Sequence, residues 1–94
     1  MSYRLRFHEL ALAEWRRLDA GLREQFKKKL AERLEHPRIP SAALSGMPDC
    51  YKIKLRSAGY RLIYRVDDTV VFVTVIAVGR RDKQKVYEVA QSRP

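Results

Sequence analysis

The sequence predicts a single α+β domain, residues 1–94, in which two N-terminal helices pack on one face of a small antiparallel sheet. Apolar residues recur at every second position near the N-terminus and again over residues 50–66, which is typical of strands. Between these segments the apolar spacing changes to that of amphipathic helices. A chain of 94 residues is long enough for one modest core. The expected order is β-α-α-β-β-β, with a short helix at the C-terminus.

The first strand is expected at residues 3–7, where Tyr3, Leu5 and Phe7 alternate with Arg4 and Arg6. It is short enough to be an edge strand. The next two segments predict consecutive amphipathic helices, one from residue 9 to a break at residues 19–21 and one that ends before residue 37, a proline. Their apolar stripes are Ala11, Trp15 and Leu18 in the first helix, and Leu22, Phe26, Leu30 and Leu34 in the second. Residues 36–48 are expected to form a connecting loop.

Residues 50–66 predict a β-hairpin with one apolar and one cationic face. The apolar residues share a face only if the turn at residues 57–59 leaves an even number of residues unpaired, because a one-residue slip exchanges the faces. In that register the opposite face carries Lys52, Lys54, Arg61 and Arg65. Neighbouring cations repel one another, so the arrangement favours a bound polyanion, although a solvated sheet face is the plainer alternative.

The last third of the chain predicts a turn, a central strand and a weak helix. The turn is expected at residues 67–69. Residues 70–78 are apolar at odd and even positions alike, as in a strand that is covered on both faces. After Gly79, residues 80–90 predict a loop that leads into a short helix with few apolar residues. Such a helix is expected to be held loosely.

The excess of basic residues limits the kinds of partner that the protein is expected to bind. Twenty Lys and Arg against eleven Asp and Glu give a net charge of +9, which favours nucleic acid, an acidic protein or an anionic membrane surface as a partner. No apolar run approaches the roughly 20 residues that span a bilayer, and charges interrupt the N-terminal apolar residues. Cys50 has no partner for an intrachain disulfide. These features predict a cytoplasmic protein that does not insert into membranes.

Most cofactor chemistry is disfavoured. His8 and His36 are far apart and Cys50 is alone, so we expect no metal site, and Cys50 is interpreted as a packed thiol rather than a nucleophile. The glycines stand singly, which excludes a glycine-rich phosphate loop. Cations and tyrosines remain, and these suffice for cleavage of RNA by its own 2′-hydroxyl, a reaction that needs no cofactor. A tyrosine base would need its pKa lowered by about three units, roughly 4 kcal/mol, which a cationic cluster can supply.

Several segments carry a family resemblance, most specifically residues 46–62. The matching segments are Glu14-Trp15-Arg16, Arg23-Glu24-Gln25, Lys27-Lys28-Lys29-Leu30, Pro37-Arg38-Ile39, Gly46 to Ser57, Gly59-Tyr60-Arg61-Leu62, Val78-Gly79 and Val86-Tyr87. With these the chain resembles RelE-type toxins of bacterial toxin–antitoxin pairs, which are messenger-RNA interferases that act in the ribosomal A site. The resemblance implies the RelE-like microbial ribonuclease fold and a metal-independent endoribonuclease without cofactors.

The resemblance also implies roles for five residues of this chain. Tyr87 matches the proposed general base, Arg81 the proposed general acid, and Lys52, Lys54 and Arg61 the cations that hold the scissile phosphate. The alternation of the hairpin independently places these three cations on one face. For Tyr87 the plainer alternative is a ring that packs on the sheet. Arginine is a weak acid, so Arg81 is interpreted as a charge stabiliser that also donates a proton.

The expected partners are messenger RNA, the ribosome and an acidic antitoxin of the RelB type, with the toxin alone as a monomer or in a toxin–antitoxin hetero-oligomer. Ser45 stands where the resemblance leads us to expect an arginine, so one peripheral phosphate contact is absent. The run Lys27-Lys28-Lys29 is either a solvated helix face or a second footprint on ribosomal RNA. Two rival functions remain at this point: a ParE-like inhibitor of DNA gyrase and a non-catalytic nucleic-acid-binding module.

Overall fold

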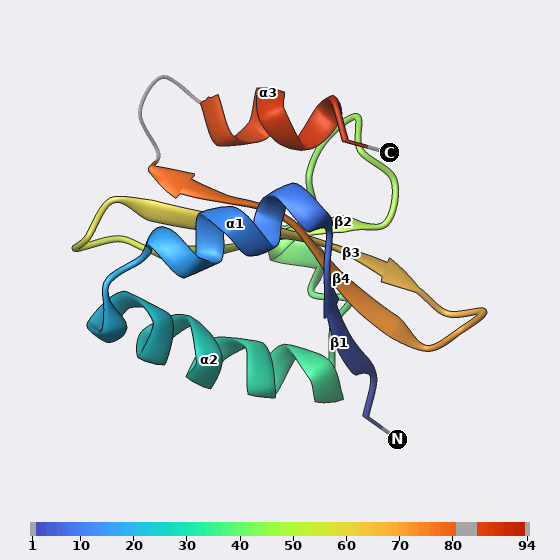
Figure 1. Cartoon of the computed structure of the whole chain (residues 1–94). Coiled ribbons are helices and arrows are strands. Elements are labelled where there is room, and N and C mark those ends of the chain that lie inside the picture. Colours follow the sequence, from blue (N-terminus) through green and yellow to red (C-terminus); the bar gives the residue numbers. More distant parts are fainter. Residues whose placement is uncertain (1, 81–84, 94) are drawn as a thin grey trace.

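The computed structural model describes residues 2–80 and 85–93, which form a four-stranded sheet with three α-helices (Figure 1). The elements are β1 (Arg4–Phe7), α1 (Glu9–Arg17), α2 (Ala20–Glu35), the 3-10 helix η1 (Pro40–Ala42), β2 (Cys50–Leu55), β3 (Tyr60–Asp67), β4 (Phe72–Arg80) and α3 (Lys85–Gln91). The α+β class and the predicted element order, with the C-terminal helix, are confirmed. None of the helices in the described part of the chain is long and apolar enough to cross a membrane.

The sheet is mixed, with strand order β1-β4-β3-β2. Strands β2, β3 and β4 form an antiparallel meander, whereas β1 pairs with β4 in parallel. The expectation of a purely antiparallel sheet was therefore wrong, because β1 pairs in parallel. The expected position of β1 at an edge of the sheet is confirmed. Alternation over four residues defines the two faces of a strand, but it contains no information on the partner or on the direction of pairing.

Helices α1 and α2 cover one face of the sheet, as predicted. Their buried residues join the apolar side of the hairpin in one core; among its members are Ala11, Leu18, Phe26, Leu30, Ile53, Leu62, Tyr64, Val73 and Val75. The two helices begin at side-chain caps: His8 Nδ1 accepts from the Leu10 amide at 3.1 Å and Asp19 Oδ1 from the Leu22 amide at 2.9 Å. The predicted break at residues 19–21 is thus confined to the cap, because α2 already begins at Ala20.

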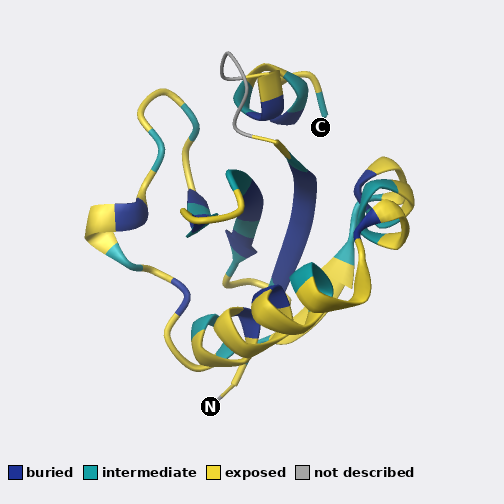
Figure 2. Ribbon diagram, turned by 90° about the vertical axis from the view of Figure 1, so that its left-hand side faces the viewer, coloured by how far each residue is buried: buried dark blue, intermediate teal, exposed yellow. Residues whose placement is uncertain are grey.

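Helix α3 covers the opposite face, so β4 is buried on both sides (Figure 2). Its Val86 and Ala90 pack on Ile63, Ile76 and Ala77 in a second, smaller core. A β-bulge in β4 helps to build this core: Ile63 pairs with Ala77 and Tyr64 with Val75, which leaves Ile76 without a partner on β3. Two consecutive apolar residues, Ile76 and Ala77, thereby belong to the same small core.

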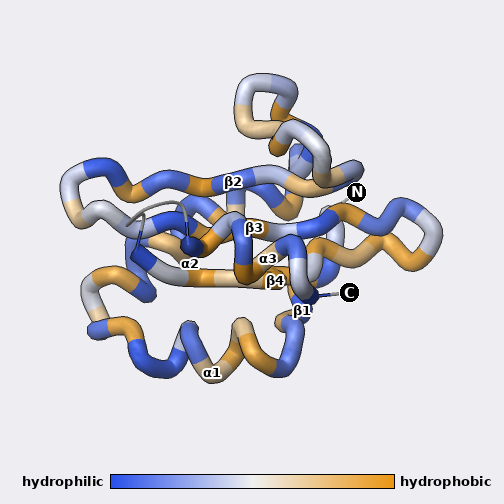
Figure 3. The backbone as a smooth tube through the Cα atoms, turned by 90° about the horizontal axis from the view of Figure 1, so that it is seen from above, coloured by the Kyte–Doolittle hydropathy of each residue, from blue (hydrophilic) through white to orange (hydrophobic). Residues whose placement is uncertain are grey.

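The hairpin has the predicted register. Leu55 pairs with Tyr60, so four residues form the turn, an even number, and Gly59 there has φ +71°, a conformation that favours glycine. Figure 3 shows the resulting alternation of hydrophobic and hydrophilic residues along β2. The next turn is longer than expected, because β4 begins at Phe72 and not at residue 70. Asp67 Oδ1 accepts from the amides of Thr69 (2.9 Å) and Val70 (3.4 Å), and this local bonding keeps both residues out of the ladder.

Candidate functional site

Three cations of the hairpin form a cluster on the sheet face that faces away from α1 and α2. Lys54 on β2 and Arg61 on β3 are directly paired, and Lys52 lies two residues before Lys54 on the same face. We call these three residues the cationic cluster. Arg61 is buried, with 8% of its surface exposed, whereas the two lysines are half-buried. The alternation in the sequence predicted this grouping.

Arg61 is the unusual member of the cluster. Its Nε is buried and has no hydrogen-bond partner in the part of the chain that the structure describes. Buried polar groups in folded proteins are almost always hydrogen-bonded, and a buried N–H donor without a partner is costly. An arginine that faces a lysine across a ladder also experiences like-charge repulsion. An anion with several acceptor oxygens, such as a phosphodiester, would satisfy Arg61 and relieve the repulsion.

Tyr87 comes to the same face from α3. Its ring is half-buried and packs against the small core that includes Ile63 and Val86. The packing role considered for Tyr87 is therefore real, and it keeps the residue on the side of the sheet that carries the cationic cluster. Arg81 lies outside the described residues. The structure thus brings four of the five predicted site residues to one face of the sheet.

The fourth cation predicted on this face, Arg65, lies toward the other end. Ile63, buried beneath α3, is placed between Arg61 and Arg65 along β3. Arg65 lines a separate hollow of about 420 Å³ together with Cys50 and Met47. Burial raises the pKa of the Cys50 thiol, and the neighbouring Arg65 offsets this only in part. Cys50 is buried, as expected of a packed thiol.

The sequence did not reveal how the end of β4 is held. Strand β1 ends opposite Val75, so among the described residues no strand pairs with the rest of β4 on that side. Side chains replace it: the Val78 amide donates to Glu14 Oε1 (3.1 Å), and Arg93 donates to the Ile76 carbonyl (2.8 Å) and to both Glu14 oxygens (2.8 and 2.9 Å). Glu14 therefore connects α1 to β4 and to the segment after α3.

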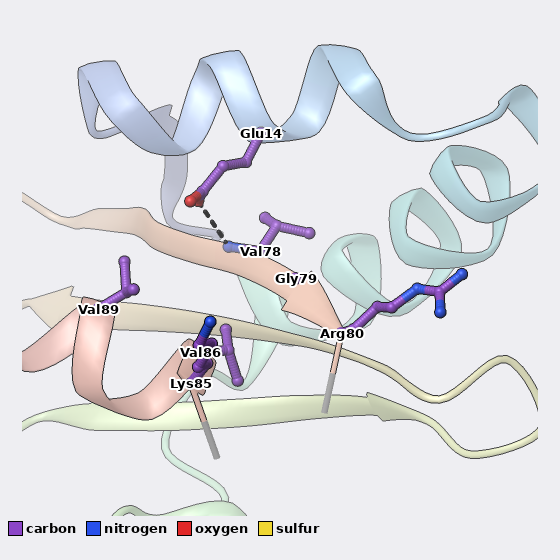
Figure 4. A pocket seen from close by; sticks show the side chains of 7 residues that line it. All are labelled: Glu14, Val78, Gly79, Arg80, Lys85, Val86 and Val89. Atoms are coloured by element: carbon purple, nitrogen blue, oxygen red, sulfur yellow. Dashed lines mark hydrogen bonds between the residues drawn. The ribbon is translucent and has the colours of Figure 1, made fainter. Parts of the chain in front are cut away.

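A groove of about 290 Å³ adjoins this connection, between α1, the end of β4 and the start of α3 (Figure 4). In the close-up, Glu14 reaches down from α1 to the Val78 amide, while the Arg80 side chain points away from the Glu14 carboxylate. Val86 and Val89 supply apolar walls from α3. Glu14 was noted in the sequence only as part of the resemblance, because no spacing rule connects a helix residue with the edge of a distant strand.

Comparison with known proteins decides the family. Residues 5–85 match the family described as "ParE toxin of type II toxin-antitoxin system, parDE". The mRNA interferase toxin RelE of Escherichia coli strain K12 is 59% identical over 93 residues, which cover 99% of this chain and 98% of the relative. The mRNA interferase RelE of Shigella flexneri matches to the same extent. The chain belongs to the RelE/ParE family of toxins.

Solved structures of RelE agree with this assignment. A free mutant of E. coli RelE superposes with a TM-score of 0.91 at 58% identity, covering 98% of this chain and 97% of that chain. A RelE chain from the intact E. coli RelBE toxin–antitoxin complex superposes with a TM-score of 0.84 at 60% identity, covering 87% of this chain and all of that chain. The predicted RelE-like fold is confirmed. Both curated RelE proteins lie on the interferase side of the family, although the matching family description names ParE.

Proposed function

We propose that this protein is the toxin of a type II toxin–antitoxin pair and an endoribonuclease that cleaves messenger RNA in the ribosomal A site. The observation that carries the proposal is Arg61, a buried guanidinium whose Nε has no partner among the described residues and which lies opposite Lys54. A protein of about this size is only marginally stable, so a buried guanidinium nitrogen without a partner calls for a functional reason. Binding of the scissile phosphate supplies one.

The proposed reaction is an internal transfer within the RNA. The 2′-oxygen of the nucleotide before the scissile bond attacks phosphorus, and the bond from phosphorus to the 5′-oxygen of the next nucleotide breaks. A base accepts the 2′-hydroxyl proton and an acid protonates the departing 5′-oxygen, so the products are a 2′,3′-cyclic phosphate and a 5′-hydroxyl. Lys52, Lys54 and Arg61 stabilise the extra negative charge that develops on the phosphorane.

The proton transfers are assigned to Tyr87 and Arg81. Tyr87, which lies on the same face of the sheet as the cationic cluster, accepts the 2′-proton. Arg81, which lies outside the described residues, donates to the 5′-oxygen or stabilises its charge. One proton is taken and one is given, so the reaction needs neither water nor a metal ion to balance.

Two rival functions are weighed against this proposal. Gyrase inhibition of the ParE type needs neither a buried phosphate-binding arginine nor a tyrosine base. A non-catalytic nucleic-acid-binding module would use the same cations without cleavage. The identity of 59% with proteins named mRNA interferase favours cleavage.

The proposed partners follow from the same comparisons and from charge. A net charge of +9 suits an acidic antitoxin segment as well as RNA, and E. coli RelE is known in complex with RelB. We infer an antitoxin of the RelB type that neutralises this toxin until it is removed. Because the translating ribosome is the proposed place of action, we also infer that the protein works in the cytoplasm.

Cleavage of a defined message on programmed ribosomes tests the proposal. We expect native protein to cut within the A-site codon, with a single-turnover rate that falls about 10²–10³-fold in Arg61→Ala and about 10²–10⁴-fold in Tyr87→Phe. Product ends should be a 2′,3′-cyclic phosphate and a 5′-hydroxyl, which end-specific enzymatic labelling distinguishes.

Matched controls separate chemistry from folding. Arg16→Ala removes an exposed arginine of α1, and Tyr3→Phe removes a tyrosine hydroxyl that bonds to Asp68, 2.5 Å away, outside the site. Both should cleave at the native rate. Folded native protein that leaves every message intact would overturn the proposal, and inhibition of gyrase by the same preparation would establish the ParE-type alternative.

A further inference from the structure

A second cationic feature lies at the outer edge of the sheet, where β2 adjoins α2. It is a cleft of about 310 Å³ between α2, η1 and β2. We call it the edge cleft. Five cations and one hydroxyl line it: Lys29, Arg33, Lys52, Lys54, Arg56 and Ser41. Among the described residues that line the cleft, none is acidic. So many cations around a small volume repel one another, and the cleft attracts anions.

In the edge cleft, hydrogen bonds hold Arg33 in a fixed position. Its guanidinium donates to the Lys52 carbonyl at 3.0 Å and to the Tyr64 hydroxyl at 2.9 Å, and it stands over the Tyr64 ring. Both acceptors are neutral, so these bonds position the cation without cancelling its charge. Lys29 and Arg56 are exposed and lie at the rim, where an incoming anion meets them.

The edge of β2 is closed to an additional strand at this point. The Arg33 guanidinium donates a hydrogen bond to the Lys52 carbonyl, which points outward from the sheet. Further along the edge, the Leu44 amide donates to the Cys50 carbonyl at 3.0 Å, and Ala43 forms an isolated bridge with Tyr51. A peptide that binds by β-strand addition needs these carbonyls. The edge cleft therefore suits a polyanion that contacts cations, such as a phosphodiester backbone, better than an extended peptide.

The edge cleft is continuous with the cationic cluster, because Lys52 and Lys54 belong to both. An RNA strand whose scissile phosphate rests on Lys54 and Arg61 reaches the edge cleft by crossing β2, and neighbouring strands are only about 4.8 Å apart. We propose that the edge cleft binds a second phosphate of the same message, one that flanks the scissile phosphate. This inference rests on the proposed ribonuclease function and adds a subsite to it.

The consecutive lysines of α2, Lys27 to Lys29, lie in different surroundings. Lys29 lines the edge cleft, whereas Lys27 pairs with Glu24 at 3.4 Å and lines a different, mainly apolar groove with Trp15 and Leu34. The three consecutive lysines are thus not one surface. A contact of this run with RNA is expected from Lys29 in particular.

Single-turnover cleavage on programmed ribosomes tests the subsite, with messages that carry a neutral methylphosphonate at one phosphate flanking the A-site codon. The variant is Lys29→Ala/Arg56→Ala, which changes two exposed side chains. On the unmodified message it should need about 10-fold more protein for half-maximal cleavage, with the same maximal rate. Methylphosphonate at the phosphate bound in the edge cleft should produce a similar shift for native protein, and no further shift for the variant.

The control is Arg16→Ala/Arg17→Ala, which removes two exposed charges from α1 and should behave as native protein does. A variant that keeps the native half-maximal concentration, or that responds to every methylphosphonate as native protein does, would overturn the subsite. In the first case, weaker binding of the variant to an acidic antitoxin would assign the edge cleft to the protein partner. In the second case, a uniform loss of affinity on all messages would assign it to ribosomal RNA. Failure of native protein to cleave the unmodified message would instead refute the ribonuclease function itself, and the subsite with it.

Discussion

Arg61 is the residue whose environment departs most from what folding alone requires. It is buried on the β2–β3 ladder opposite Lys54, and its Nε lacks a partner among the described residues. Interiors tolerate such groups when function needs them, and the cost appears as lower stability. The period-two alternation around Arg61 was enough to place it on a cationic face, but exposure and missing partners emerge only from the packed structure.

Replacement of Arg61 by methionine should separate stability from activity. Methionine keeps much of the length and flexibility of arginine without its charge, so we expect the free energy of unfolding to be unchanged or raised by about 0.5–2 kcal/mol, and cleavage to be lost. Chemical denaturation monitored by circular dichroism measures the first effect. Arg16→Met on exposed α1 should stay within about 0.5 kcal/mol. A clear loss of stability in Arg61→Met would mean that Arg61 is structural.

A second group of charged residues lies outside the site and responds to pH. Asp68, in the turn between β3 and β4, accepts from the Tyr3 hydroxyl at 2.5 Å and from Arg38 at 2.7 Å. These hydrogen bonds, with that of Tyr3 the larger, lower the pKa of the Asp68 carboxyl. They connect the N-terminus and the loop after α2 to the far end of the sheet.

The lowered pKa of Asp68 predicts the sign of its pH dependence. A carboxyl whose pKa is lower in the folded state stabilises the protein above its unfolded pKa of about 3.9, and this contribution disappears as the pH falls through the folded value. Thermal unfolding of native protein and Asp68→Asn should therefore differ at pH 6 and converge in stronger acid. A difference that persists at the lowest pH would contradict the assignment, and Glu24→Gln is the control on exposed α2.

At the scale of elements, α3 makes more stabilising contacts than its sequence suggested. Its few apolar residues led us to expect a loosely held helix, yet Val86 and Ala90 are buried on the sheet and Arg93 ties the following segment to Glu14 and to the edge of β4. Because Tyr87 stands on this helix, the anchoring of α3 also decides where the proposed general base lies.

Removal of the Glu14 carboxylate should loosen this anchoring. Glu14→Ala leaves the buried Val78 amide without its acceptor and Arg93 without its counter-ion, so we expect a loss of about 1–3 kcal/mol in the free energy of unfolding. Glu24→Ala breaks only the exposed pair with Lys27 and should cost less than about 1 kcal/mol. Equal losses of unfolding free energy for the two substitutions in denaturant titrations would show that the hydrogen bonds of Glu14 stabilise the protein no more than an exposed ion pair does.

The sequence predicted some elements better than others for identifiable reasons. The hairpin register followed from alternation, because a slip by one residue would have buried Lys52 and Lys54 with the core. The partner of β1 did not follow, since four alternating residues fit either direction of pairing. The start of β4 was misplaced because Val70 is strongly apolar, whereas the side chain of Asp67 and a φ of 59° at Val71 place both valines in the turn.

At the scale of the whole molecule, the fold gathers cations from distant segments. Those of the cationic cluster lie close together in sequence and could be predicted, but the edge cleft combines α2 with β2, and no spacing in the sequence connects Lys29 with Arg56. The roles of Tyr87 and Arg81 came from the family resemblance alone and stay predictions. Two adjoining cationic sites, in a chain whose net charge is +9, suit a long polyanion better than a small anionic ligand.

The central claim, cleavage by the RNA's own 2′-hydroxyl on the cationic face, has one direct test. A message with a single deoxyribose at the mapped cleavage position keeps every phosphate and loses only the proposed nucleophile. On programmed ribosomes, native protein should leave that position uncut, while it still cuts the all-ribose message and binds both equally. Cleavage at the deoxyribose position would contradict the account, because the attacking oxygen would then have to come from water or from the protein.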